Sequence, residues 1–102
     1  MLRKTSLSSG EVLVAASPAV IFAGPCYLAS VTIITDGTNP ATVIAYDNAS
    51  AASGDKRFEN AVVGANNYGG RSWTFPVLCS NGLTISLSGT LCSAIVEYIP
   101  IV

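Results

Sequence analysis

Apolar and polar residues alternate with a period of two along several short segments of this chain, the pattern typical of β-strands. The clearest case is the segment 28–48, in which two runs rich in β-branched residues flank the sequence Asp-Gly-Thr-Asn-Pro at 36–40. Gly37 can adopt a positive φ, and the side chains of Asp36 and Asn39 can bond to their own backbone. The pattern therefore predicts a β-hairpin.

The two arms of this predicted hairpin have different faces. In the first arm, residues 26–35, one face is formed by Ala29, Val31 and Ile33 and is wholly apolar, so we expect it to face the core. The second arm, residues 41–46, is partly apolar on both faces. This pattern predicts a central pair of strands in a sandwich.

Turn residues bound the other strand candidates. These candidates cover residues 11–16, 19–23, 57–63, 72–79, 83–88 and 92–99. Asn81-Gly82 is the best two-residue turn signal, and no helical segment of convincing length is present. The sequence therefore predicts an all-β fold, an antiparallel β-sandwich of about eight short strands, and a jelly-roll-like arrangement fits this count.

Two segments are expected to be irregular, residues 47–56 and residues 64–71, with Tyr68 on the surface. The alternation in 72–79 places Trp73, Phe75 and Val77 on one face. Pro76 lies among them and indicates an edge strand or a bulge, because proline cannot donate to a strand ladder.

The 102 residues are enough for a single domain with its own core, and no linker or repeat divides them. We expect residues 1–10 to form an N-terminal arm ahead of the sandwich. Arg3 and Lys4 precede an apolar stretch as in a signal peptide, but Ser-Ser-Gly-Glu and Pro18 interrupt it, so export is not predicted. No apolar run reaches the roughly 18 residues that span a bilayer.

Charge is scarce in this sequence. Charged residues make up 11% of the chain and the net charge is −1, whereas a typical protein has about 25% charged residues. Such a surface attracts neither nucleic acid nor an anionic membrane, and neither is expected as a partner. A surface rich in Ser, Thr, Ala and Asn favours a protein covered by neighbouring subunits.

The chain has few residues suited to catalysis. It has no histidine, so the commonest general base and metal ligand is missing. The three cysteines, Cys26, Cys79 and Cys92, form no CxxC motif and are expected to be buried and reduced, although one bridge with one free thiol stays open. We predict no enzymatic activity and no cofactor. Asp36 and Asp47 are interpreted as turn formers.

Several segments of the chain resemble small structural proteins of tailed bacteriophages, especially those of cyanobacterial and marine phages. The matching segments are Gly-Pro-Cys-Tyr-Leu-Ala-Ser-Val-Thr-Ile at 24–33, Asp-Gly-Thr-Asn-Pro-Ala-Thr-Val at 36–43, Ala-Tyr-Asp-Asn-Ala-Ser-Ala-Ala-Ser-Gly at 45–54, Cys-Ser-Asn-Gly-Leu at 79–83 and Leu-Ser-Gly-Thr at 87–90. They are turns and strands, so they specify a fold family better than a function.

The resemblance implies a virion component made in the host cytoplasm and assembled onto the particle. Within that class a capsid decoration (cement) protein fits best, on the capsid surface, as a dimer or trimer bound to the major capsid protein or other virion proteins. A neck, tail or fibre module is the alternative. A carbohydrate-binding module is another, with Tyr68, Trp73 and Tyr98 as a stacking platform.

Chain ends and irregular loops are the parts that a rigid sandwich can offer to partners. The predicted contact residues are accordingly Leu2, Arg3, Lys4, Tyr68, Arg71, Ile99, Ile101 and Val102.

Overall fold

The computed structural model describes residues 9–14, 18–63 and 68–101, which form eight β-strands and no helix. The strands are β1 (Ser9–Val14), β2 (Ala19–Phe22), β3 (Cys26–Ile34), β4 (Ala41–Tyr46), β5 (Lys56–Val62), β6 (Tyr68–Cys79), β7 (Leu83–Gly89) and β8 (Ser93–Pro100). The predicted all-β fold of about eight short strands is confirmed.

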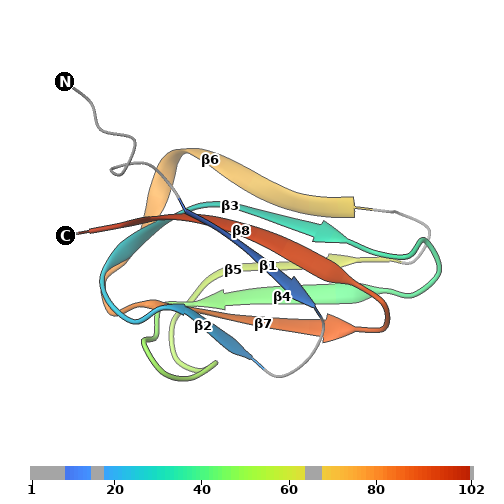
Figure 1. Cartoon of the computed structure of the whole chain (residues 1–102), viewed down its shortest axis with the longest axis horizontal. Helices are drawn as coiled ribbons and strands as arrows, with labels where there is room; N and C mark the ends of the chain where they lie inside the picture. Colours follow the sequence, from blue (N-terminus) through green and yellow to red (C-terminus); the bar gives the residue numbers. More distant parts are fainter. Residues whose placement is uncertain (1–8, 15–17, 64–67, 102) are drawn as a thin grey trace.

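The strands form two antiparallel sheets of four, in the orders β1-β8-β3-β6 and β2-β7-β4-β5. Figure 1 shows the first sheet in the upper part of the molecule and the second below it. The chain forms one long hairpin that is folded over itself, because β1 pairs with β8, β2 with β7, β3 with β6 and β4 with β5. The tip of this long hairpin lies between β4 and β5. This strand order is that of a jelly roll.

The predicted hairpin at residues 28–48 is wrong in its pairing. β3 lies between β8 and β6, whereas β4 lies between β7 and β5 in the other sheet. The segment between them therefore crosses from one sheet to the other. Asn81-Gly82 likewise joins β6 to β7 across the sandwich instead of closing a hairpin. Turn residues reverse the chain, but non-local packing decides which strand it then pairs with.

The turn chemistry expected at Asp36 is confirmed. One carboxylate oxygen of Asp36 accepts hydrogen bonds from the backbone N–H of Asn39 at 2.8 Å and of Thr38 at 2.9 Å, and Gly37 has a φ of 86°. The bonds from Asn39 and Thr38 lower the pKa of Asp36. Asp36 is thus a turn former, as predicted.

The core lies between the sheets and is built from alternate residues of the inner strands. Its largest fully buried aliphatic side chains are Leu28, Val31, Ile33, Val43, Leu83, Ile85 and Val96. Burial of Leu28 contradicts the predicted face of the first arm. The register of β3 shifts between Leu28 and Ser30, so the alternation restarts there and Leu28 faces inward together with Val31.

β6 is an edge strand with a break in its ladder. Val77 of β6 lies opposite Leu28 of β3, and the next paired residue of β6 is Ser72, opposite Ser30. Residues 73–76 therefore have no Cα partner on β3. The edge or bulge predicted from Pro76 is therefore confirmed. Residues 68–71, which the sequence placed in an irregular segment, belong to this strand.

The carboxylate of Asp47 joins the tip of the long hairpin to the crossing between β6 and β7. Its side chain is only 2% exposed. One oxygen accepts the backbone N–H of Asn81 at 2.8 Å and of Gly82 at 3.3 Å. The other accepts the hydroxyl of Ser80 at 3.3 Å and the guanidinium of Arg57 at 3.2 Å. We call this arrangement the Asp47 clamp.

Neighbouring contacts tighten the same joint. Asn48 Oδ1 accepts the backbone N–H of Ser50 at 2.9 Å, and the buried Thr84 hydroxyl donates to the Asn48 carbonyl at 2.7 Å. A Cβ on Gly82 would lie 2.7 Å from the Cα of Ala49. Position 82 therefore requires glycine because the backbone near Ala49 approaches it so closely.

Asp47 is ionised in the fold at neutral pH. Burial favours its neutral form, but the bonds from Asn81, Arg57, Gly82 and Ser80 outweigh burial and lower the pKa of the carboxyl. Asp47 therefore does more than form a turn, because it links three segments that are distant in the sequence.

We expect Asp47→Asn to lower the free energy of unfolding at pH 7 by about 2 kcal/mol, because hydrogen bonds to a charged group contribute that much. An unfolded aspartate has a pKa of about 3.9, so the advantage of the wild type is present above about pH 4 and is lost as the pH falls through the lowered folded pKa. Urea unfolding between pH 7 and pH 2 measures both effects.

The matched control is Asp55→Asn, which removes an exposed carboxylate from the same loop. It should leave the unfolding free energy within about 0.5 kcal/mol of the wild type. A difference between Asp47→Asn and wild type that stays constant across this pH range would contradict an ionised clamp.

Candidate functional site

The outward side of β8, β3 and β6 carries the largest group of exposed apolar side chains among the residues whose burial the structure describes. Register aligns the outward residues of β6, β3 and β8 in four rows, which are Leu78–Tyr27–Ile99, Ser72–Ser30–Glu97, Gly70–Thr32–Ile95 and Tyr68–Ile34–Ser93. We call these residues the apolar outer face. Of the ten exposed large hydrophobic residues whose burial the structure describes, five belong to it, namely Tyr27, Ile34, Tyr68, Leu78 and Ile95.

This face is almost free of charge. Glu97 is the one charged residue in the four rows, and its carboxylate accepts the Ser30 hydroxyl at 2.6 Å. Arg71 is also on β6, but it is opposite the core residue Val31, so alternation turns it away from Tyr68. The result is a flat surface, apolar at both ends and hydroxyl-rich in the middle.

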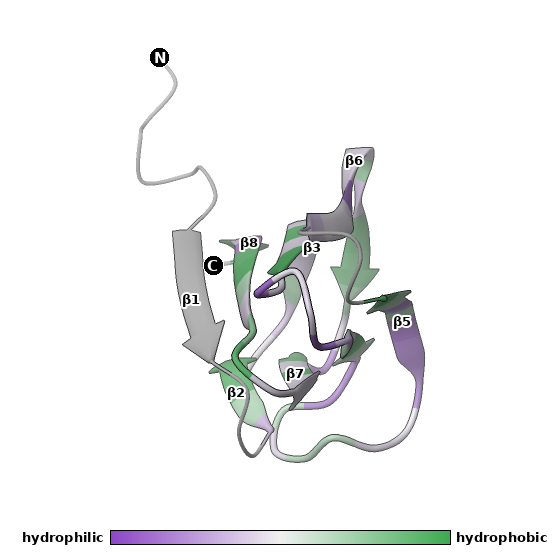
Figure 2. Ribbon diagram, turned by 90° about the vertical axis from the view of Figure 1, so that its right-hand side faces the viewer, coloured by the Kyte–Doolittle hydropathy of each residue, from purple (hydrophilic) through white to green (hydrophobic). Residues whose placement is uncertain are grey.

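The opposite sheet is different on its outward side. β5 carries Lys56, Arg57 and Glu59, and the ammonium of Lys56 lies 3.2 Å from the Glu59 carboxylate. Figure 2 shows the contrast between the hydrophilic β5 and the largely hydrophobic β8. Charges on an edge strand discourage edge-to-edge pairing. The sheet containing β5 is therefore the less suited of the two to an apolar partner.

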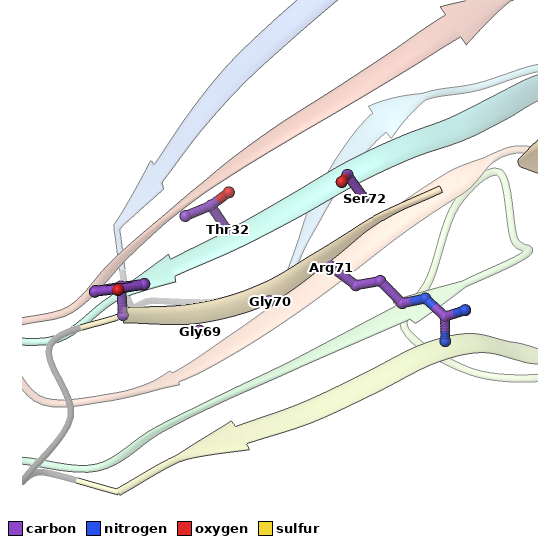
Figure 3. A pocket seen from close by; sticks show the side chains of 6 residues that line it. Thr32, Gly69, Gly70, Arg71 and Ser72 are labelled. Carbon is purple, nitrogen blue, oxygen red and sulfur yellow. The ribbon is translucent and has the colours of Figure 1, made fainter. Parts of the chain in front are cut away.

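An open pocket of about 330 Å³ lies within the apolar outer face, lined by Thr32, Tyr68, Gly69, Gly70, Arg71 and Ser72. Figure 3 shows Arg71 extending away from Thr32 and Ser72, so the pocket presents the hydroxyl groups of these two residues, the Tyr68 side chain and the backbone of the two glycines. Gly70 has a φ of 127°, and a Cβ there would lie 2.0 Å from the Val31 carbonyl oxygen. Only glycine fits this close approach.

Trp73 closes the edge of the sandwich beside this face. Its ring meets that of Phe58 on β5 edge to face, with the centroids 5.2 Å apart, and the Arg71 guanidinium lies 5.4 Å from the Trp73 centroid. Both rings pack against the core. Phe75, expected to share the face of Trp73, is instead 87% exposed. Residues 73–76 leave the ladder, so simple alternation does not hold there.

The three aromatic residues proposed for sugar stacking do not form one platform. Tyr68 is 74% exposed on the apolar outer face, whereas Trp73 points toward β5. Tyr98 packs inward against Phe22, with the ring centroids 5.8 Å apart. This geometry does not favour the carbohydrate-binding alternative.

The predicted contact residues are only partly brought together. Tyr68 and Ile99 lie on the apolar outer face, and Arg71 lies at its edge. Ile101 is 39% exposed, and its backbone N–H donates to the Pro25 carbonyl at 3.0 Å. Leu2, Arg3, Lys4 and Val102 fall outside the described residues. Of the predicted arm 1–10, the last two residues, Ser9 and Gly10, belong to β1.

Sequence reasoning missed most of the apolar outer face. Tyr27, Ile34, Leu78 and Ile95 were assigned no partner role, because each is one apolar residue within an alternating strand. A signal was present in β8, where Ile95 and Ile99 fall on the same face as Ser93 and Glu97. Only the strand order shows that these residues align with Ile34 and Tyr27.

Cys26, Cys79 and Cys92 are buried and unbridged, as expected from the sequence. No group of three or more His, Cys, Asp or Glu side chains suited to a metal ion occurs in residues 9–14, 18–63 and 68–101. Over the same ranges, the structure has no helix long and apolar enough to cross a membrane.

Comparison with known proteins adds no assignment: no protein-family model, curated protein sequence or solved structure matches the chain.

We expect Trp73→Ala to lower the free energy of unfolding by about 2 kcal/mol, because it removes the packing with Phe58 that closes the sandwich edge. Tyr68→Ala should change it by less than about 0.5 kcal/mol, because Tyr68 is mostly solvent-exposed. Chemical denaturation of the two variants measures the difference. Equal losses would show that the two rings do not have the separate roles described here.

Proposed function

We propose that the protein is a non-enzymatic structural subunit of a phage virion, a decoration (cement) protein that binds and stabilises the head shell. The apolar outer face is the structural observation that carries this proposal. The resemblance of five sequence segments to phage structural proteins supplies the biological setting. Jelly rolls are also found in viral capsid proteins, although a fold alone does not define a function.

The chemistry of the apolar outer face suits a permanent contact. Covering Ile34, Tyr68 and Ile95 removes apolar surface from water, which favours association by roughly 25 cal/mol per Å². Glu97 is the one charged residue in the four rows, and the Ser30 hydroxyl supplies one of the hydrogen bonds that its carboxylate needs when covered. Many copies on one shell would multiply weak individual contacts, so each contact need not be large.

The partners in this proposal are the major capsid protein, or another virion protein, and further copies of the same chain as a dimer or trimer. Such a protein would be made in the host cytoplasm and reside on the capsid surface. A neck, tail or fibre module would use the same kind of face and differs only in its position on the particle.

Position on the particle tests the proposal. The protein is labelled with antibody-conjugated gold on purified phage particles, and the particles are imaged. A decoration protein gives an even coat over the head. Label at a single vertex identifies a neck or tail component and contradicts the decoration role, and absence from the particles contradicts the virion proposal altogether.

The double substitution Ile34→Lys and Ile95→Lys tests the surface itself. Two charges at the apolar end of the face that Ile34, Ile95 and Tyr68 form should weaken co-sedimentation with the particles at least about tenfold, the equivalent of 1.4 kcal/mol. Both side chains are partly exposed, so the unfolding midpoint should change little.

The control is Val20→Lys, since Val20 is 45% exposed and is aligned with Thr84 in the opposite sheet. It should bind particles as the wild type does. Loss of binding in Val20→Lys with normal binding of the double variant would move the contact to the β2-β7-β4-β5 sheet.

A further inference from the structure

Two of the three cysteines lie opposite each other on neighbouring strands. Cys26 is the first residue of β3 and Cys79 the last residue of β6, and the two are Cα partners in the antiparallel ladder. Directly opposed residues in such a ladder have Cα atoms about 4.5–5.5 Å apart. A disulfide spans Cα atoms about 4.4–6.8 Å apart, so the typical spacing of such a pair is within the range of a disulfide.

The surroundings of the pair keep the thiols together. Both side chains are fully buried, and the Cys79 thiol donates to the Val77 carbonyl oxygen at 3.9 Å. The neighbouring Cys79 thiol lowers the pKa of Cys26, and the neighbouring Cys26 raises the pKa of Cys79. Cys92 is elsewhere, in the connection between β7 and β8, with its sulfur 3.9 Å from the Ser88 carbonyl oxygen.

We propose that Cys26 and Cys79 form an intramolecular disulfide when the protein meets a small-molecule disulfide such as oxidised glutathione. The Cys26 thiolate attacks one sulfur of the reagent, whose S–S bond breaks and releases one thiol. The Cys79 thiolate then attacks the sulfur of Cys26 in the mixed disulfide and releases the second thiol. Two protein thiols are oxidised, and one reagent disulfide is reduced to two thiols.

The bridge would reinforce the joint of the fold. Cys79 directly precedes Ser80 and Asn81, which bind the Asp47 carboxylate, so the covalent bond would hold the start of β3 beside the Asp47 clamp. It also closes a long loop of chain, and closing a long loop restricts the unfolded state strongly. Because both cysteines lie at strand ends, local opening of those ends admits the reagent. The proposal does not depend on the proposed function.

Thiol counting tests the proposal on the full chain. The protein is incubated with oxidised or with reduced glutathione, unfolded in the presence of iodoacetamide, and weighed by mass spectrometry. The oxidised monomer should carry one alkylated cysteine and the reduced monomer three. Three alkylated cysteines after oxidation, a stable glutathione adduct or a covalent dimer would each overturn the proposal.

Variants identify the bonded pair. Cys92→Ala should carry no alkylated cysteine after oxidation and two after reduction, whereas Cys26→Ala and Cys79→Ala should carry two under both conditions. A bridge in either of these last two variants would assign the disulfide to Cys92. Should they not fold, the Cys92→Ala result decides alone.

Stability supplies an independent readout. Oxidation should raise the urea midpoint of the wild type and of Cys92→Ala, and dithiothreitol should reverse the shift. An oxidised protein with an unchanged midpoint would show that the bridge does not reinforce the fold.

Discussion

The buried Asp47 carboxylate links segments of this fold that lie far apart in the sequence and whose contact no local pattern predicts. The jelly roll brings its first strand beside its last, and its hairpin tip must meet a crossing that lies more than thirty residues further along the chain. Asp47 makes that meeting specific, since its two oxygens accept four hydrogen bonds from three residues of the crossing and from Arg57. Burial of the hydrophobic core supplies most of the stabilisation, but it is non-directional. The hydrogen bonds of the Asp47 clamp are directional and therefore specify which segments meet.

The same geometry separates the roles of the two sheets. The β2-β7-β4-β5 sheet carries the Asp47 clamp, the loop at its tip and a charged edge strand, all of which serve the domain itself. The β1-β8-β3-β6 sheet presents Ile34, Ile95 and Tyr68 to solvent with a single charge among its aligned rows. Exposed apolar surfaces of this kind mark sites of interaction with partners in many proteins. The proposed contact with a partner accordingly uses the β1-β8-β3-β6 sheet.

The fold class followed from the sequence, but the strand partners did not. Alternation in residues 83–88 and 92–99 predicted strands, because the period of two is a local property of the chain. The segments Asp-Gly-Thr-Asn-Pro and Asn-Gly correctly predicted where the chain reverses, because a turn depends on local sequence. They wrongly predicted that the flanking strands pair, because the sheet that a strand joins depends on non-local packing. The shifted register at Leu28 and the break at residues 73–76 interrupt the alternation, so no periodic pattern predicts them. The apolar outer face combines three strands that are distant in sequence, so only the topology could show it.

The position of β8 between β1 and β3 has a consequence for synthesis of the protein. A ribosome releases β1 and β3 long before β8, so the sheet that carries the apolar outer face cannot close until β8 has been synthesised. Until then β1 and β3 lack the strand that lies between them. Copies cut short before β8 would therefore lack the finished face, and only chains that include β8 would present it.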